Sequence, residues 1–160
     1  MIFREDLAVA ILRGEKTVTR RRLVDNPRSP WYRGHHPGDR YPEGSTFTVN
    51  PGRGLLRVGE CEVTARYWQL LGSVDSAIAK QEGFALMVDF RAGWREINGT
   101  YDGEEEVEVV EFKLHGPDCM GCDGCGWCEG SPAFTCPDCF GTGIEVSPRG
   151  RALIAKLASA

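Results

Sequence analysis

A chain of 160 residues can form one ordinary domain with a small appendage, but it is too short for two full domains. Its hydrophobic share of 41% and charged share of 26% are those of a water-soluble globular protein, and no apolar run is long enough to cross a bilayer. The N-terminal residues lack the pattern of a secretory signal, so we expect a cytoplasmic protein with no membrane partner.

The net charge of −4 conceals a basic N-terminal part. Residues 1–40 contain nine basic and five acidic residues and therefore carry +4, which leaves −8 for the rest of the chain. A basic patch on an acidic protein suits a localised anionic ligand better than a general coating of nucleic acid. The plainer alternative is a solvated face whose charges are paired.

The predicted elements follow one another along the chain. Residues 3–13 place apolar side chains at helical spacing, and Gly14 is suited to end that helix. Residues 17–42 are rich in Arg, Pro and Gly and lack periodicity, as long functional loops often do. Strand patterns follow at 45–50, 55–66 and 107–114, and helices are predicted at 73–81 and 86–94, on either side of Gly83.

These patterns predict an α+β fold, in which residues 1–116 form a small, partly closed β-barrel with two or three short helices. Residues 117–146 are dominated by Cys and Gly and predict a separate metal-binding module, similar to a zinc ribbon. Residues 147–160 predict a short terminal helix, because Ser147 and Pro148 suit the N-cap and first helical positions.

Six of the seven cysteines lie between residues 119 and 139, where the pattern Cys-x-x-Cys-x-Gly-x-Gly occurs twice. Two residues between thiolates allow both sulfurs to face one cation, and the glycines permit positive-φ turns and a close approach of the backbone. Two such turns supply the four ligands of a closed structural Zn²⁺ site. The predicted ligands are Cys119, Cys122, Cys136 and Cys139.

The repeated octet resembles the cysteine-rich zinc-binding repeats of DnaJ-type chaperones, present here as one pair. Disulfides are disfavoured in a reducing compartment, whereas an iron–sulfur cluster is compatible with the spacing. Cys125 and Cys128 could replace the first pair, share a second site with His115 or be spectators, which is the interpretation we favour. Cys61, in a strand pattern, is predicted to be a buried apolar side chain.

The loop after the first helix collects an ammonium, two hydroxyls and three guanidiniums within a few residues. This concentration of donors suits a phosphate or the polar edge of a base. In an extended chain, successive side chains point to opposite sides. Lys16, Val18 and Arg20 would then face one way, and Thr17, Thr19 and Arg21 the other.

The pattern Ile11-Leu12-x-Gly14-x-Lys16-Thr17-x-Thr19-x-Arg21 resembles the signature of the ASCH domain family, relatives of the PUA-like barrels. The resemblance covers residues 2–114, and further fragments agree with it in order. These are Pro37-Gly38-Asp39, Asn50-Pro51-Gly52-Arg53-Gly54, Gln81-Glu82-Gly83-Phe84, Phe90-x-x-x-Trp94 with Ile97-Asn98, and Val109-Val110-Glu111-Phe112.

The resemblance implies a cleft that binds RNA, a nucleotide or a nucleoside, with DNA as a further possibility, in a bacterial or phage protein. Its ligand-binding residues would be Lys16, Thr17, Thr19, Arg21 and Arg53, with Arg20 and Arg22 at the rim. Some family members hydrolyse N4-acylated cytidine, and a few are reported as ribonucleases. If this chain is such an enzyme, the resemblance implies Lys16, Thr19 and Glu82 as its catalytic residues.

Three functions therefore stand as hypotheses. The leading one is an ASCH-like protein that binds RNA or a nucleotide in a basic cleft, because the long loop, the extra arginines and the zinc module favour a larger anionic partner. The second is an amidohydrolase in which Lys16 activates Thr19 and Glu82 shuttles a proton. The third is a non-enzymatic adaptor whose zinc module contacts another protein. In an empty binding cleft, Glu82 would neutralise Lys16 or Arg21.

Overall fold

The computed structural model describes residues 1–36, 39, 41–128 and 134–159, and the chain divides into two compact units. Unit 1 comprises Met1–Glu15, Thr46–Glu62 and Lys113–Ala160. Unit 2 comprises Lys16–Ser45 and Val63–Phe112. Among the described residues, no helix has the length and apolar character needed to span a membrane. Pro37 and Gly38, which belong to the ASCH-like pattern, lie outside the described residues.

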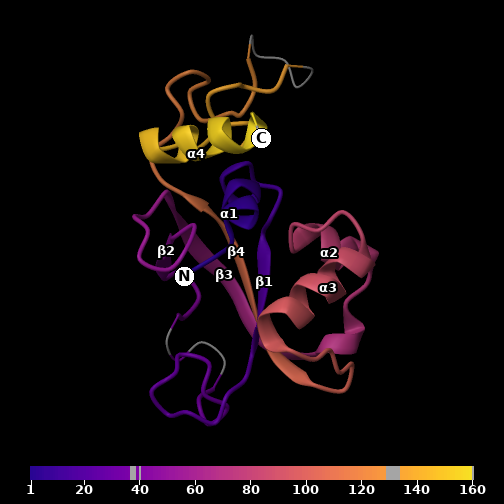
Figure 1. The fold of residues 1–160 in the computed structure, drawn as a ribbon. Coiled ribbons are helices and arrows are strands. Elements are labelled where there is room, and N and C mark those ends of the chain that lie inside the picture. Colours follow the sequence, from indigo (N-terminus) through magenta and orange to yellow (C-terminus); the bar gives the residue numbers. More distant parts are fainter. Residues whose placement is uncertain (37–38, 40, 129–133, 160) are drawn as a thin grey trace. The chain divides into compact units, whose positions relative to one another are not determined.

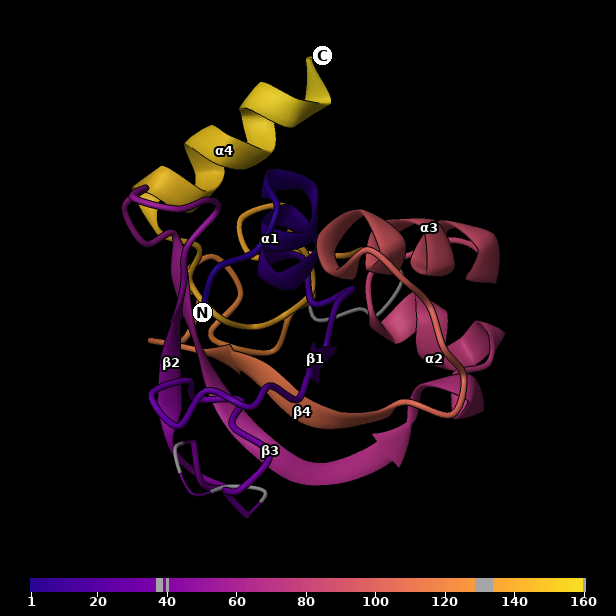
Figure 2. The same ribbon diagram turned by 60° about the horizontal axis from the view of Figure 1, so that its bottom comes forward.

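The described residues of unit 1 form two helices and one antiparallel strand pair. Helix α1 (Glu5–Leu12) packs against α4 (Pro148–Ala158), and Figure 1 shows the two helices next to each other. Strand β2 (Thr46–Val49) pairs antiparallel with the first part of β3 (Gly59–Leu70), as Figure 2 shows.

The N-terminus of α4 forms as the sequence predicted. The Ser147 hydroxyl accepts a hydrogen bond from the Gly150 amide at 3.1 Å, with Pro148 at the start of the helix. The same hydroxyl donates to the Val58 carbonyl at 2.6 Å. One side chain therefore caps α4 and ties its first turn to the segment that leads into β3.

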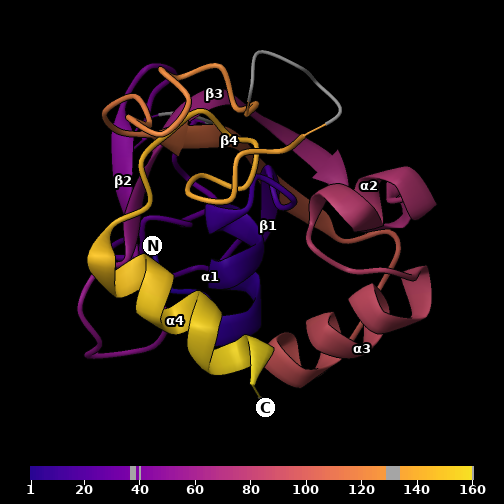
Figure 3. The same ribbon diagram turned by 90° about the horizontal axis from the view of Figure 1, so that it is seen from above.

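In unit 2, the described residues form the second strand pair and two short helices. Strand β1 (Val18–Arg22) pairs antiparallel with β4 (Glu106–His115). After the 3₁₀ turn η1 (Leu71–Ser73), α2 (Ser76–Gln81) and α3 (Met87–Asn98) pack together, and Figure 3 shows them side by side. Their apolar faces bury a common core. It contains Leu71, Val74, Ala79, Phe90, Trp94 and Val107.

The described strands form one antiparallel sheet in the order β1-β4-β3-β2. The predicted small α+β class with short helices is thus confirmed, with a four-stranded antiparallel sheet among the described residues, while its closure into a partial barrel stays a prediction. The strand predicted at 55–66 runs from Gly59 to Leu70. The helix predicted at 86–94 extends to Asn98. The helix predicted at 73–81 begins later, at Ser76, because Asp75 is its N-cap residue. The Asp75 carboxylate accepts a hydrogen bond from the Ile78 amide at 2.8 Å.

Strand β1 was not predicted, because the residues after Val18 are a threonine and three arginines, and these lack the apolar side chains typical of a buried strand. Three consecutive side chains, Val18, Thr19 and Arg20, are nevertheless buried. A buried arginine is tolerated only when acidic or carbonyl partners surround it. Those partners define the candidate site.

Candidate functional site

A network of buried charges surrounds Glu82, at the C-terminal end of α2. The helix ends there because Gly83 takes a positive φ of 87°, which leaves Glu82 as the C-cap residue. The Thr17 amide donates to the Gln81 carbonyl at 2.9 Å, so the segment before β1 lies against the end of α2. This contact brings Lys16 to Glu82.

Lys16 is buried, with only 2% of its surface exposed, and its ammonium is fully hydrogen-bonded. The Nζ atom donates to Glu82 Oε2 at 2.7 Å, to the Glu82 carbonyl at 2.8 Å and to the Val18 carbonyl at 2.6 Å. An ammonium has three donors, and all three are used. Burial lowers the pKa of Lys16, and the neighbouring Glu82 carboxylate opposes that shift.

The same carboxylate holds a second cation. Arg20 Nη1 donates to Glu82 Oε1 at 2.8 Å, and Arg20 Nη2 donates to Gln69 Oε1 at 2.8 Å. Glu82 therefore bridges an ammonium and a guanidinium, and the three groups together carry +1. Gln69, on β3, is half-buried and connects this cluster to the surface.

A second polar contact lies on the surface of the same sheet face. Tyr67, two residues before Gln69 on β3, donates its hydroxyl to Glu111 Oε1 at 2.7 Å. Burial and Glu111 raise the pKa of Tyr67, and the charge of Arg20 acts in the opposite direction. Sequence reasoning missed Gln69 and Tyr67, because single polar residues in a strand pattern carry no motif.

The structure brings Lys16, Arg20 and Glu82 together, but it does not add Thr19 to them. Successive side chains of a strand point to opposite faces, so Thr19 leaves β1 on the face opposite Arg20. Thr19 is buried, and no hydrogen bond of its hydroxyl joins it to another residue in the described part of the chain. The proposed grouping of Lys16, Thr19 and Glu82 thus stays a prediction.

The remaining predicted ligand residues lie in several environments. Arg20, predicted at the rim, is instead buried against Glu82. Arg22 forms an ion pair with Glu105 at 2.5 Å and donates to the Asn98 carbonyl at 2.7 Å. Thr17 is half-buried, and Arg53 is exposed in the loop that follows β2 in unit 1.

Arg21 lies in an aromatic environment that the sequence did not predict. Its guanidinium carbon is 5.7 Å from the centre of the Trp31 ring, and that of Arg66 is 5.4 Å from the same ring. Arg66 also lies over Tyr41 and forms a buried ion pair with Glu108. Trp31 is half-buried and packs on these two cations.

The four predicted cysteine ligands cluster in unit 1. Their sulfurs lie within 4.8 Å of one another, with Cys119 and Cys136 separated by 3.9 Å and Cys122 and Cys139 by 3.7 Å. A tetrahedral ion with metal–sulfur bonds of about 2.3 Å places its sulfurs about 3.8 Å apart. The arrangement is therefore compatible with a metal site, and all seven cysteines are free thiols.

The two octets adopt the same backbone path. Their fifth residues, Asp123 and Phe140, have φ values of 50° and 54°, and the glycines at the sixth and eighth positions also have positive φ. A side chain at Gly126 would overlap the Gly141 carbonyl, and one at Gly143 would overlap the Gly124 carbonyl. Only glycine permits this mutual approach, as the repeat predicted.

The pKa values of two of these thiols are shifted in opposite directions. Burial raises the pKa of Cys119 to about 12. At Cys136 burial also favours the neutral thiol, but backbone amides such as that of Cys139 outweigh it and lower its pKa to about 7. These opposite shifts are expected where neighbouring thiols compete for one negative charge, which a bound cation would relieve.

Cys125 and Cys128 are outside the group of four sulfurs. Cys125 is exposed and donates to the Trp127 carbonyl at 3.3 Å, whereas Cys128 packs against the cluster. His115 is 3.7 Å from Glu62 in the same unit. In the described part of the chain, no second group of metal ligands joins these residues.

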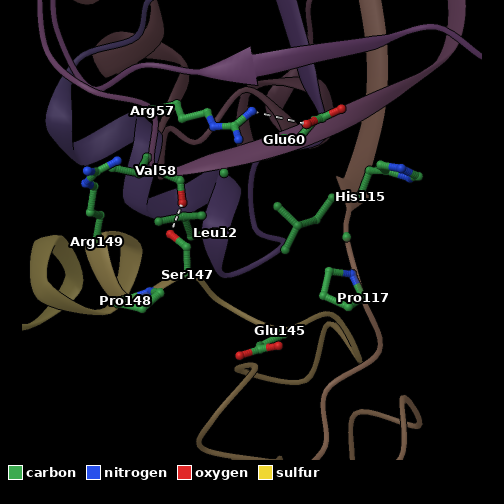
Figure 4. Close-up of a pocket in the computed structure, with 13 residues that line it drawn as sticks. Leu12, Arg57, Val58, Glu60, His115, Pro117, Glu145, Ser147, Pro148 and Arg149 are labelled. Atoms are coloured by element: carbon green, nitrogen blue, oxygen red, sulfur yellow. Dashed lines mark hydrogen bonds and ion pairs between the residues drawn. The ribbon is translucent and has the colours of Figure 1, made fainter.

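A cavity of about 550 Å³ lies in unit 1, and Figure 4 shows its walls. Leu12 and Val58 contribute apolar walls, Arg149 and Glu145 contribute charged ones, and the capping residue Ser147 lies between them. His115, considered above for a second metal site, lines it, whereas the predicted cleft residues and the clustered cysteines do not.

Comparisons with solved structures identify the fold. One match is an ASCH domain from Lactobacillus crispatus, with a TM-score of 0.53 and 15% identity over 68% of this chain and 69% of that chain. Another is a protein from Enterococcus faecalis, with a TM-score of 0.50 and 12% identity over 71% of this chain and 78% of that chain. No protein-family model and no curated protein matches the chain. The structural likeness supports an ASCH-like fold, while the likeness of the cysteine module to DnaJ-type repeats stays a prediction.

Proposed function

We propose that this chain is an ASCH-like protein that binds RNA, or a nucleotide or nucleoside, at the polar network around Glu82. The observation that carries the proposal is the buried bridge Lys16–Glu82–Arg20, in which one carboxylate holds two cations. Buried ion pairs seldom add net stability, so their presence favours a role other than folding. Perturbed charges concentrated at one place are typical of functional sites.

In the ligand-free protein, Glu82 occupies positions that an anionic group of a ligand would take. A phosphate that approaches Arg20 competes with the carboxylate for the guanidinium, which is well suited to bidentate phosphate binding. The half-buried Gln69 and the exposed Tyr67 provide the surface approach to this cluster. An RNA segment or a single nucleotide fits this combination of a cation, an amide and an aromatic ring.

The test is the affinity of the protein for a single-stranded RNA 12-mer, measured by fluorescence anisotropy at several salt concentrations. We expect the affinity to fall as salt rises, and Arg20→Met to weaken binding about tenfold, as expected for loss of one bidentate contact. Arg151→Met, at an exposed position on α4, is the control that changes net charge equally. Equal affinities of the two folded variants would refute this site.

We also propose that Cys119, Cys122, Cys136 and Cys139 hold a structural Zn²⁺ ion. Four thiolates form a closed tetrahedral site, which stabilises the module and leaves no coordination position for a substrate. Metal analysis of the purified protein should give one zinc per chain. An iron content with visible absorbance would identify an iron–sulfur cluster in its place.

A second function is supported by the lowered pKa of Lys16. A buried lysine next to a carboxylate is the kind of group that activates a nucleophile in amide hydrolysis. In the present arrangement all three Nζ donors are engaged, so Lys16 would have to transfer a proton before it acts as a base. Incubation with N4-acetylcytidine tests this function, and a protein that binds the nucleoside without releasing cytidine would exclude it.

An adaptor role is the third alternative. The cysteine module exposes Met120, Trp127 and Phe134, with 88%, 39% and 57% of their surfaces accessible. Exposed aromatic side chains are common in protein interfaces. A pull-down with the wild-type chain and a Trp127→Ala/Phe134→Ala variant would test it, and identical sets of captured proteins would argue against this role.

A further inference from the structure

Gln69 has an amide group whose orientation is determined by its neighbour. Arg20 Nη2 lies 2.8 Å from Gln69 Oε1, and a guanidinium can only donate hydrogen bonds. The oxygen of the amide must therefore face Arg20, since the flipped amide would place two donors against each other. The Nε2 group, with its two N–H donors, points away from the guanidinium.

These two donors have no acceptor among the residues that the structure describes. The backbone of Gln69 lies within β3, and its side chain is half-buried. Arg20 is itself locked by Glu82 at 2.8 Å, so the amide cannot rotate without the loss of a bond to a buried charge. Gln69 thus presents a fixed pair of donors at the surface of the network.

We propose that Gln69 is the residue through which this site distinguishes nucleobases, by donating to an acceptor edge formed by a ring nitrogen or a carbonyl oxygen. This inference rests on the proposed function, in which Arg20 binds the anionic part of the ligand and Lys16 adds positive charge to the network. Amide side chains read base edges in this way, while contacts to phosphate position the ligand without selecting a base.

The neighbouring residues fit that assignment. Arg20 provides positive charge beside the amide, which disfavours a cationic ligand group there and favours an acceptor. Tyr67, two residues earlier on the same face of β3, offers an exposed ring on which a base can stack. A base held on Tyr67 would have its edge beside Gln69, because alternate residues of a strand lie on one face.

The experiment measures the affinities of the four nucleoside 5′-monophosphates AMP, CMP, GMP and UMP by isothermal titration calorimetry. The wild-type protein should bind the preferred nucleotide about tenfold more tightly than the least preferred, which is typical of readout by one side chain. Gln69→Leu should reduce this spread, the ratio of the tightest to the weakest affinity, to about twofold, because leucine fills the space without hydrogen-bond donors. Gln69→Glu keeps an acceptor for Arg20 and should shift the preference towards bases that present an amino group.

Two controls separate this inference from the proposed function. Gln81→Leu removes the other glutamine, which is exposed at the end of α2, and should leave the spread unchanged. Lys16→Met should weaken all four nucleotides together. An unchanged spread in Gln69→Leu, or a wild-type protein that binds all four equally, would overturn the role of Gln69 and leave the binding site intact. Failure of the wild type to bind any of the four would overturn both.

Discussion

Replacement of Glu82 by glutamine is the most informative perturbation of the buried network. The carboxylate is the shared partner of Lys16 at 2.7 Å and Arg20 at 2.8 Å, and both cations are almost fully buried. In Glu82→Gln the amide can accept from one cation only and presents its own donors to the other. Removal of one partner from a buried ion pair costs about 3–5 kcal/mol. Since small domains have stabilities of about 5–15 kcal/mol, this variant should be severely destabilised.

The pH dependence of this loss has a definite sign. Burial lowers the pKa of Lys16 below its ordinary value of 10.5, and Glu82 opposes that shift, so the pKa in Glu82→Gln should be lower still. The unfolded chain then binds more protons than the folded one between the two pKa values, and the free energy of unfolding rises with pH in that window. The deficit of Glu82→Gln should therefore shrink as the pH approaches 10.5.

Urea denaturation of the wild-type protein and of Glu82→Gln, between pH 6 and pH 10, measures how their difference in the free energy of unfolding changes with pH. Lys16→Met should be less damaging, because Glu82 retains Arg20, and Glu43→Gln at an exposed position should be neutral. A loss of stability in Glu82→Gln below about 1 kcal/mol, or one that grows with pH, would contradict a charge network that depends on this carboxylate.

The other predictions concern the cysteine module and the aromatic contacts. Cys136→Ser should lower metal affinity by more than the about 100-fold typical of outer-shell changes, whereas Cys125→Ser should keep one metal per chain by elemental analysis. Gly126→Ala should destabilise the metal-bound module by at least about 2 kcal/mol, because its Cβ would overlap a carbonyl as well as strain φ. Gly44→Ala, where φ is 79° and the space is open, should lower the free energy of unfolding by only about 1 kcal/mol. Thermal unfolding of the two glycine variants and the wild type measures both effects. Trp31→Ala should cost about 1–2 kcal/mol in urea denaturation, since two cations lose their aromatic contact.

Sequence reasoning predicted the clustered cysteines more fully than the charged cluster. The cysteine octets predicted which four of six clustered thiols converge, because ligand spacing and glycine placement are local properties of the chain. The spectator interpretation of Cys125 remains untested, although its sulfur is outside the group of four. The core residues Phe90 and Trp94 lie four positions apart on α3, a spacing that places both side chains on one helix face.

The charged cluster could be predicted only in part. The alternation of side chains indicated that Lys16 and Arg20 would share a face, and both reach Glu82. Their degree of burial was not predictable, because arginine is usually exposed and only the pairing with a distant carboxylate makes burial possible. Gln69 is 49 residues from Arg20 in sequence, so no local pattern connects them.

The central claim, that ligand binds at the Lys16–Glu82–Arg20 network, is tested most directly by NMR of the side-chain N–H groups during titration with a nucleoside monophosphate. The Arg20 Nε–H and the Gln69 amide are the reporters, since both lie in the network. We predict that these two signals shift in a saturable manner, while the Gln81 amide does not. Saturable binding that shifts backbone signals elsewhere and leaves both reporters unchanged would contradict the claim.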